Sequence, residues 1–258
     1  MKLRSILLAT IAATAFAGAA NAASVAALVG NDTLAVVDTT AKKVTKTMKV
    51  TGLSGALIGI DVRPADGMLY GLTDDGSVFT IAMDGKATKK SQLETMLAKG
   101  TVATVDFNPV ADRLRVMGAD GTSLRANVDD GKVIKDGSHK YADGDMHKGE
   151  KPNVIAGAYT HSVKGAKETA LFNIDGTIGA LVKQAPPNDG VLNAVGKLGM
   201  KADTVAFDIW SDGSKNDAWL MVKDTLYSVD LMTGKATEAA KISGVSGAVR
   251  DIAILPAM

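Results

Sequence analysis

The chain contains no cysteine, and only 4% of its residues are aromatic. The lack of cysteine excludes disulfide bonds, thiolate metal sites and a lipid anchor on an amino-terminal cysteine. Neither sign of charge predominates, since 29 basic residues face 28 acidic ones. Nucleic-acid-binding proteins carry clustered basic surface, so we expect no nucleic-acid partner. Because cysteine is absent, the fold must be stable without disulfide bonds.

The amino terminus has the pattern of a signal peptide. Lys2 and Arg4 precede an apolar stretch over residues 6–17, and small residues follow up to position 22. The stretch is shorter than the roughly 20 residues that a membrane-spanning helix needs, which makes a retained anchor the weaker alternative. The sequence therefore predicts a signal peptide at 1–22, export to the periplasm or beyond, and no membrane span after cleavage.

The rest of the chain, residues 23–258, repeats a pattern of short strands and is predicted to be one domain. Residues 58–76 and 103–121 each contain a strand with an aspartate, a turn, a second strand and a turn that ends in glycine. Apolar and polar residues alternate along these segments, which is typical of half-buried strands. Third strands closed by a Gly-Lys turn follow at several places.

The repeat has a period of 43 to 52 residues, measured between equivalent positions of the first strands. Four of these positions hold aspartate and the third in order holds Ala158. A period of this length with about four short strands indicates a β-propeller rather than a helical solenoid. The predicted blades between the chain ends are residues 57–97, 102–138, 154–199 and 204–244.

The two chain ends complete a fifth predicted blade. Residues 249–255 form a first strand with no others after it, and residues 25–50 supply three strands that lack a first one. Pairing of the two ends would close the ring and protect the strand edges. A helix-like piece at 91–98 interrupts the first blade, and a non-repeat insertion at 139–152 follows the second.

Several longer motifs resemble domain of unknown function family 4394. The resemblance extends from about Leu34 to Trp219 and implies exported bacterial proteins with propeller-like repeats and no assigned activity or catalytic residues. His161 departs from it, since asparagine is expected after the Tyr-Thr pair. The motifs are Asp106–Val116, Tyr141–Asp145, Pro152–Val154 with Ala158–Thr160, and Gln184–Asn193.

The first-strand residues form the first candidate site, because innermost strands line the channel of a propeller. A ring of carboxylates there would bind a hard cation such as Ca²⁺ or Mg²⁺. The alternative is structural, with each aspartate accepting backbone hydrogen bonds or pairing with one of Arg63, Arg113, Arg115, Arg125 and Arg250. The candidate ligand-binding residues are Asp61, Arg63, Asp106, Asn108, Asp208 and Asp251.

The insertion forms the second candidate site. Imidazole and carboxylate groups together suit Zn²⁺ or Cu²⁺, although the spacing matches no standard zinc signature and a solvated polar loop is the alternative. The candidate metal ligands are His139, Asp143, Asp145 and His147, with Tyr141, Met146, Glu150 and His161 nearby.

No motif for a serine nucleophile or a phosphate-binding loop occurs. Trp210 and Trp219 are candidates for ligand contacts or for packing between blades. The sequence favours a non-enzymatic module that binds an unidentified ligand or protein. A divalent-cation-dependent hydrolase or lactonase-like enzyme and a structural component of an envelope or secreted assembly are the alternatives.

Overall fold

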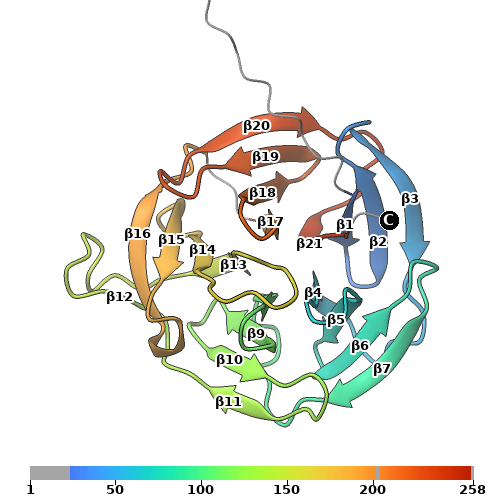
Figure 1. Cartoon of the computed structure of the whole chain (residues 1–258), viewed down its shortest axis with the longest axis horizontal. Coiled ribbons are helices and arrows are strands. Elements are labelled where there is room, and N and C mark those ends of the chain that lie inside the picture. Colours follow the sequence, from blue (N-terminus) through green and yellow to red (C-terminus); the bar gives the residue numbers. More distant parts are fainter. Residues whose placement is uncertain (1–23, 201–203, 257–258) are drawn as a thin grey trace, which may run out of the picture.

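The protein is an all-β, five-bladed propeller in the computed structural model, which describes residues 24–200 and 204–256. Five small sheets surround a central axis, each with its first strand innermost and its last strand on the rim (Figure 1). Neighbouring strands in the blades are antiparallel, except for one short parallel pair at the outer edge of the fourth blade. The predicted fold class is confirmed.

The blades follow the order of the chain, with one exception at the closure. Blade 1 joins β21 (Val249–Ile254) to β1 (Ser24–Val29), β2 (Thr33–Asp38) and β3 (Lys43–Lys49). Blade 2 contains β4 (Leu57–Val62), β5 (Leu69–Thr73), β6 (Ser77–Ile81) and β7 (Ala87–Gln92). Blade 3 contains β8 (Ala103–Asn108), β9 (Arg113–Gly118), β10 (Ser123–Ala126) and β11 (Val133–Lys135).

The other two blades differ in their outer strands. Blade 4 contains β13 (Val154–Tyr159), β14 (Leu171–Asp175), β15 (Ala180–Gln184), β16 (Val191–Lys197) and, outside β16, the short β12 (Lys140–Tyr141). Blade 5 contains β17 (Ala206–Ser211), β18 (Asn216–Val222), β19 (Thr225–Val229) and β20 (Ala236–Lys241).

Closure of the ring occurs inside blade 1, as predicted. Strand β21 pairs antiparallel with β1, with Ala26 opposite Ala253 and Ala27 opposite Ile252. The Leu255 N–H also donates to the Ser24 carbonyl at 2.8 Å. The first and last described strands of the chain are therefore adjacent in one sheet.

The hydrophobic core lies largely between the blades. Buried side chains form five clusters; one packs blade 1 against blade 2, for example through Leu28, Leu57 and Phe79. Another packs blade 2 against blade 3, where the Tyr70 and Phe107 rings meet edge to face with centroids 5.2 Å apart. Because each blade buries its faces on its neighbours, the innermost strands are held at fixed positions around the axis.

The turns explain why glycine is abundant in this chain. Gly76 and Gly121 end equivalent turns before the third strands of blades 2 and 3, with φ values of 81° and 95°. These angles are readily adopted by glycine and strained for other residues.

The helix predicted at 91–98 is wrong. Strand β7 continues to Gln92, and the residues after it form bends without helical hydrogen bonds. The apolar spacing of Leu93, Met96 and Leu97 resembles one face of a helix, but these residues pack against the core between blades 2 and 3. A piece this short has little helical stability of its own, so packing decides its conformation.

The insertion at 139–152 is partly structured. Lys140 and Tyr141 form β12, which pairs parallel with Val191 and Leu192 of β16, so the insertion begins as a fifth strand of blade 4. The predicted signal peptide lies outside the described residues. Within the described part of the chain, no helix has the length and apolar character needed to cross a membrane.

Candidate metal centre in the central channel

Four aspartates lie on the innermost strands of four different blades. Asp61 lies on β4, Asp106 on β8, Asp208 on β17 and Asp251 on β21. Each is at most 8% exposed. The repeat that predicted their equivalence in sequence therefore places them together in space.

Each of these carboxylates joins two blades by accepting a backbone hydrogen bond from the next innermost strand. The Phe107 N–H donates to Asp61 at 2.6 Å, and the Tyr159 N–H donates to Asp106 at 2.9 Å. The same arrangement links Asp208 to the Ile254 N–H at 2.7 Å, and Asp251 to the Ile60 N–H at 2.9 Å. The structural role predicted for them, acceptance of backbone hydrogen bonds, is thus present.

Blade 4 is the exception to this pattern, because it has Ala158 where the others have aspartate. The junction between blades 4 and 5 therefore lacks a carboxylate bridge. A side-chain acceptor links these blades elsewhere, where Asn216 Oδ1 accepts from the His161 N–H at 2.7 Å.

No arginine pairs with these aspartates within the described residues, so that part of the structural alternative is wrong. Arg115 and Arg125 both bind Asp136. Arg250 binds the Gly30 carbonyl, the Asn31 side chain and the Leu57 carbonyl. Arg250 acts on Asp251 only at a distance, where its charge lowers the pKa of that carboxyl. Asp61, Asp106 and Asp208 have no ion pair with a basic side chain among the described residues.

Three of the carboxylates converge closely enough to bind one ion. One oxygen each from Asp61, Asp106 and Asp208 lie within 4.8 Å of one another. In the described part of the chain, these are the residues that form such a group. Carboxylate oxygens brought together in this way are the ligand type that Ca²⁺ and Mg²⁺ prefer.

Burial strongly disfavours ionisation of these groups when no cation is present. It raises the pKa of Asp61, Asp106 and Asp251 well above the ordinary value, and the charges of neighbouring aspartates raise them further. The pKa of Asp208 is raised to about 6 by burial, against the lowering effect of its two backbone hydrogen bonds. Shifts of this kind in a cluster indicate that a proton or a cation must balance the charge.

Asp106 has one carboxylate oxygen that accepts no hydrogen bond within the described part of the fold. Its Oδ1 accepts from the Tyr159 N–H, whereas its Oδ2 accepts no hydrogen bond from the described residues. Asp61 and Asp208 accept on both oxygens, from Val62 and Phe107 and from Ile209 and Ile254 respectively. An oxygen that accepts no hydrogen bond from the described residues is free to bind an ion, so Asp106 is the strongest candidate for direct cation coordination.

A pocket of about 340 Å³ opens onto two of these carboxylates. Asp61 and Asp208 lie in its lining together with Trp210, and Ser162 and Lys164 reach it from the loop between β13 and β14. In Figure 1 this loop extends over the middle of the ring. The pocket is therefore an entrance to the carboxylate cluster at one end of the channel.

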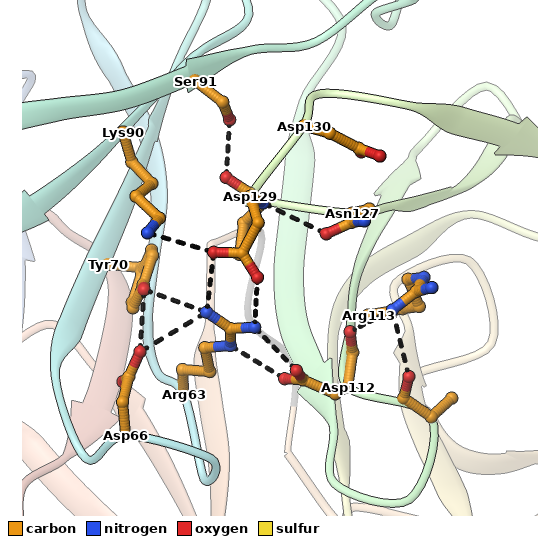
Figure 2. Close-up of polar contacts among 12 residues, drawn as sticks. Arg63, Asp66, Tyr70, Lys90, Ser91, Asp112, Arg113, Asn127, Asp129 and Asp130 are labelled. Atoms are coloured by element: carbon orange, nitrogen blue, oxygen red, sulfur yellow. Dashed lines mark hydrogen bonds and ion pairs between the residues drawn. The ribbon is translucent and has the colours of Figure 1, made fainter.

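Arg63 and Asn108, which the sequence also assigned to the channel, have other roles. Arg63 is 7% exposed and binds Asp112 through two hydrogen bonds of 2.8 and 2.6 Å (Figure 2). It also contacts Asp129, Asp66 and the Tyr70 hydroxyl. Asn108 Oδ1 accepts from the Val110 and Ala111 N–H groups and so closes the turn between β8 and β9.

We expect Arg63→Lys to destabilise the protein by about 2 kcal/mol, because an ammonium cannot reproduce the paired hydrogen bonds to Asp112 and the contact to Asp129. Urea unfolding followed by circular dichroism measures the change. Arg113→Lys is the matched control, since Arg113 bonds only to carbonyls of its own turn. Equal losses in the two variants would show that the Arg63 contacts contribute nothing specific.

The residues of the insertion occupy separate environments. His139 is buried, neither ring nitrogen has a hydrogen-bond partner, and burial lowers its pKa to about 4. His147 Nδ1 lies 3.0 Å from Glu150, Asp145 accepts from the Ala194 N–H, and Asp143 pairs with Lys148. This arrangement does not gather the four candidates around one point in the described chain. The predicted zinc or copper site stays a prediction.

Trp210 and Trp219 both pack against the core between blades 5 and 1. Trp210 also lines the channel entrance, whereas Trp219 is absent from that lining. The packing role is confirmed for both, and a ligand contact by Trp210 stays a prediction. Sequence reasoning missed Ser162 and Lys164. The length of their loop could have identified them. The connection between β13 and β14 has 11 residues, from 160 to 170, and is longer than the equivalent connections in blades 2, 3 and 5.

Comparison with solved structures supports the fold alone. A protein of unknown function from Bacteroides thetaiotaomicron VPI-5482 is similar with a TM-score of 0.54 and 16% identity, covering 88% of this chain and 63% of that one. A protein of unknown function from Bacteroides caccae has a TM-score of 0.45 and 11% identity, covering 92% and 100%. Comparison with curated proteins finds none that matches this chain.

The family comparison covers most of the sequence. The sequence profile described as Domain of unknown function (DUF4394) matches residues 33–253. That span includes all four channel aspartates and the loop over the channel entrance. The resemblance stated from the motifs is confirmed, and the chain belongs to the DUF4394 family.

Proposed function

We propose that this protein is an exported, non-enzymatic binding module that holds a divalent cation in the channel of its propeller. The observation that carries the proposal is the convergence of one oxygen each from Asp61, Asp106 and Asp208 within 4.8 Å, with no ion pair to a basic side chain among the described residues. A bound cation would balance charge that the fold otherwise buries at a cost.

Ca²⁺ suits the site better than Mg²⁺. The carboxylates of Asp61 and Asp208 are fixed by backbone hydrogen bonds on both oxygens, which limits their freedom to adopt ideal octahedral geometry. Mg²⁺ demands that geometry, whereas Ca²⁺ accepts irregular sets of six to eight oxygens. Water or a ligand entering through the pocket would supply the remaining oxygens.

Export is supported by the amino-terminal signal pattern and agrees with a calcium site, because extracellular modules meet Ca²⁺ at high concentration and bind it with Kd values of about 10⁻⁴ to 10⁻³ M. A divalent-cation-dependent hydrolase would use the same cation. The titratable side chains in the pocket lining are Asp61, Asp208 and Lys164. Two are cation ligands and no imidazole joins them, so binding is the better-supported function.

Isothermal titration calorimetry on metal-free protein tests the proposal. We expect one Ca²⁺ per chain, weaker binding of Mg²⁺, and a melting temperature that rises with Ca²⁺ concentration, since a ligand that binds only the folded state stabilises it. His147→Gln is the control, because the insertion lies outside the channel, and it should bind Ca²⁺ like the wild type. No heat and no thermal shift with either ion would overturn the proposal.

A further inference from the structure

The pocket at the channel entrance has the dimensions of a small-molecule site. Its volume of about 340 Å³ falls in the range of ligand pockets, at the small end. Its lining combines the two carboxylates with a largely apolar wall, made up of Val62, Pro64, Val163, Ile209, Trp210, Ile254, Leu255 and Pro256. A ligand here meets an apolar surface on its side and the proposed cation beneath it.

The charge of the carboxylate cluster at the bottom, or floor, of the pocket determines which ligand charges the pocket can accept. Three ionised carboxylates around a divalent cation leave a net negative charge. Such a floor repels anions at short range, because the carboxylates are buried and little screened by solvent. Lys164 is exposed at the rim, where solvent and salt screen its charge. Neutral oxygen donors are therefore favoured.

The apolar wall adds a second requirement. Trp210 is half-buried, with part of its surface in the pocket lining. An aromatic side chain beside oxygen-binding groups suits a ligand with one apolar face and several hydroxyl groups. A pyranose ring has both properties, with axial C–H groups on a face and vicinal hydroxyls at its edge.

Resting on the cation site proposed above, we infer that the channel-entrance pocket binds a neutral monosaccharide unit, which coordinates Ca²⁺ through two vicinal hydroxyls and lies against Trp210. The hydroxyl oxygens complete the cation coordination that the three carboxylates begin. Ser162, on the loop over the entrance, also lines the pocket, and its hydroxyl donates to the Tyr159 carbonyl at 2.9 Å.

Calorimetric titration of the Ca²⁺-saturated protein with methyl α-D-mannopyranoside and methyl β-D-galactopyranoside tests this inference. We expect binding of at least one glycoside, abolished by chelation of Ca²⁺ and about tenfold weaker or absent for D-glucuronate, because its carboxylate faces the negative floor. Binding of Ca²⁺ without binding of either glycoside would overturn the inference and leave the cation proposal standing. Tighter binding of D-glucuronate, or glycoside binding that survives chelation, would also overturn it.

Two variants separate the pocket from the cation. Trp210→Ala should lose glycoside binding and keep Ca²⁺ binding, which also shows that the variant is folded, and Trp210→Phe should recover part of the glycoside affinity. Trp219→Phe is the matched control, because Trp219 packs on the same core outside the pocket, and it should bind the glycoside like the wild type. Unchanged affinity in Trp210→Ala would contradict the assigned contact.

Discussion

Replacing Asp106 with asparagine will lower the affinity for Ca²⁺ by about a hundredfold, because the charge of the ligand set governs affinity at such sites. The same change will raise the melting temperature of the Ca²⁺-free protein. Asparagine keeps an oxygen to accept from the Tyr159 N–H and removes a buried negative charge. Each kcal/mol gained corresponds to about 2–4 °C for a chain of this size. Calorimetric titration and thermal unfolding in chelator measure the two effects.

Thr104→Val provides the control for Asp106→Asn. Thr104 lies on the same strand, and its Oγ1 accepts from the Gly157 N–H of blade 4 at 3.1 Å, so it bridges the same two blades without charge. This variant should lose about 1–3 kcal/mol of stability, because it leaves a buried donor unpaired, and should bind Ca²⁺ unchanged. If Asp106→Asn bound Ca²⁺ as tightly as the wild type, the channel cluster would not be the cation site.

Stability of the Ca²⁺-free protein will fall as pH rises from about 4 to above 6, opposite to the usual behaviour of carboxylates in ion pairs. The pKa of Asp208 is about 6 in the folded protein and 3.8 in the unfolded chain. Between pH 3.8 and pH 6 the folded state therefore binds more protons than the unfolded state. Its contribution is complete below pH 3.8 and is lost as pH rises through the folded pKa. The difference corresponds to ~3 kcal/mol, and the raised pKa values of Asp61, Asp106 and Asp251 extend the loss to higher pH.

Urea unfolding over this pH range, in chelator and in saturating Ca²⁺, measures the profile. Ca²⁺ should reverse it, since the cation binds the ionised carboxylates and stabilises the folded state by mass action. Asp208→Asn should flatten the slope in chelator. Asp212→Asn should not, because backbone hydrogen bonds lower the pKa of Asp212 to about 2 and its titration lies below the range. A profile that rises with pH in chelator would contradict the uncompensated charge in the channel.

The propeller could be predicted from the sequence because the pattern of strands and turns repeats along the chain. With Ala158 counted between Asp106 and Asp208, the positions of Asp61, Asp106, Asp208 and Asp251 recur every 43 to 52 residues. A closed ring turns such regular spacing along the chain into equivalent positions around an axis. Their convergence follows from that geometry without any knowledge of side-chain contacts. The closure of blade 1 was predictable for the same reason, since β21 and β1 to β3 are incomplete alone.

Contacts between blades could not be predicted in the same way. Arg63 is two residues from Asp61, which in a strand means the same face, yet it follows the end of β4 and turns toward Asp112 of the next blade. Whether a guanidinium group faces the axis or a neighbouring turn depends on the residue at which the strand ends and on how adjacent blades are positioned relative to each other. Neither is encoded in local pattern, which is why the arginine partners predicted for the channel aspartates were wrong.

The closure of blade 1 by β21 also determines the order in which parts of the propeller can form during folding. Because the amino-terminal part of a chain emerges first, the edge of β1 that pairs with β21 stays open until residues 249–254 have followed. Asp251 and the Ile254 N–H that binds Asp208 arrive in that same final segment. Asp61, Asp106 and Asp208 are all present earlier, so a cation could gather blades 2, 3 and 5 before the ring is complete. Until β21 pairs with it, the edge of β1 is unpaired, and an unpaired strand edge can associate with other chains during folding.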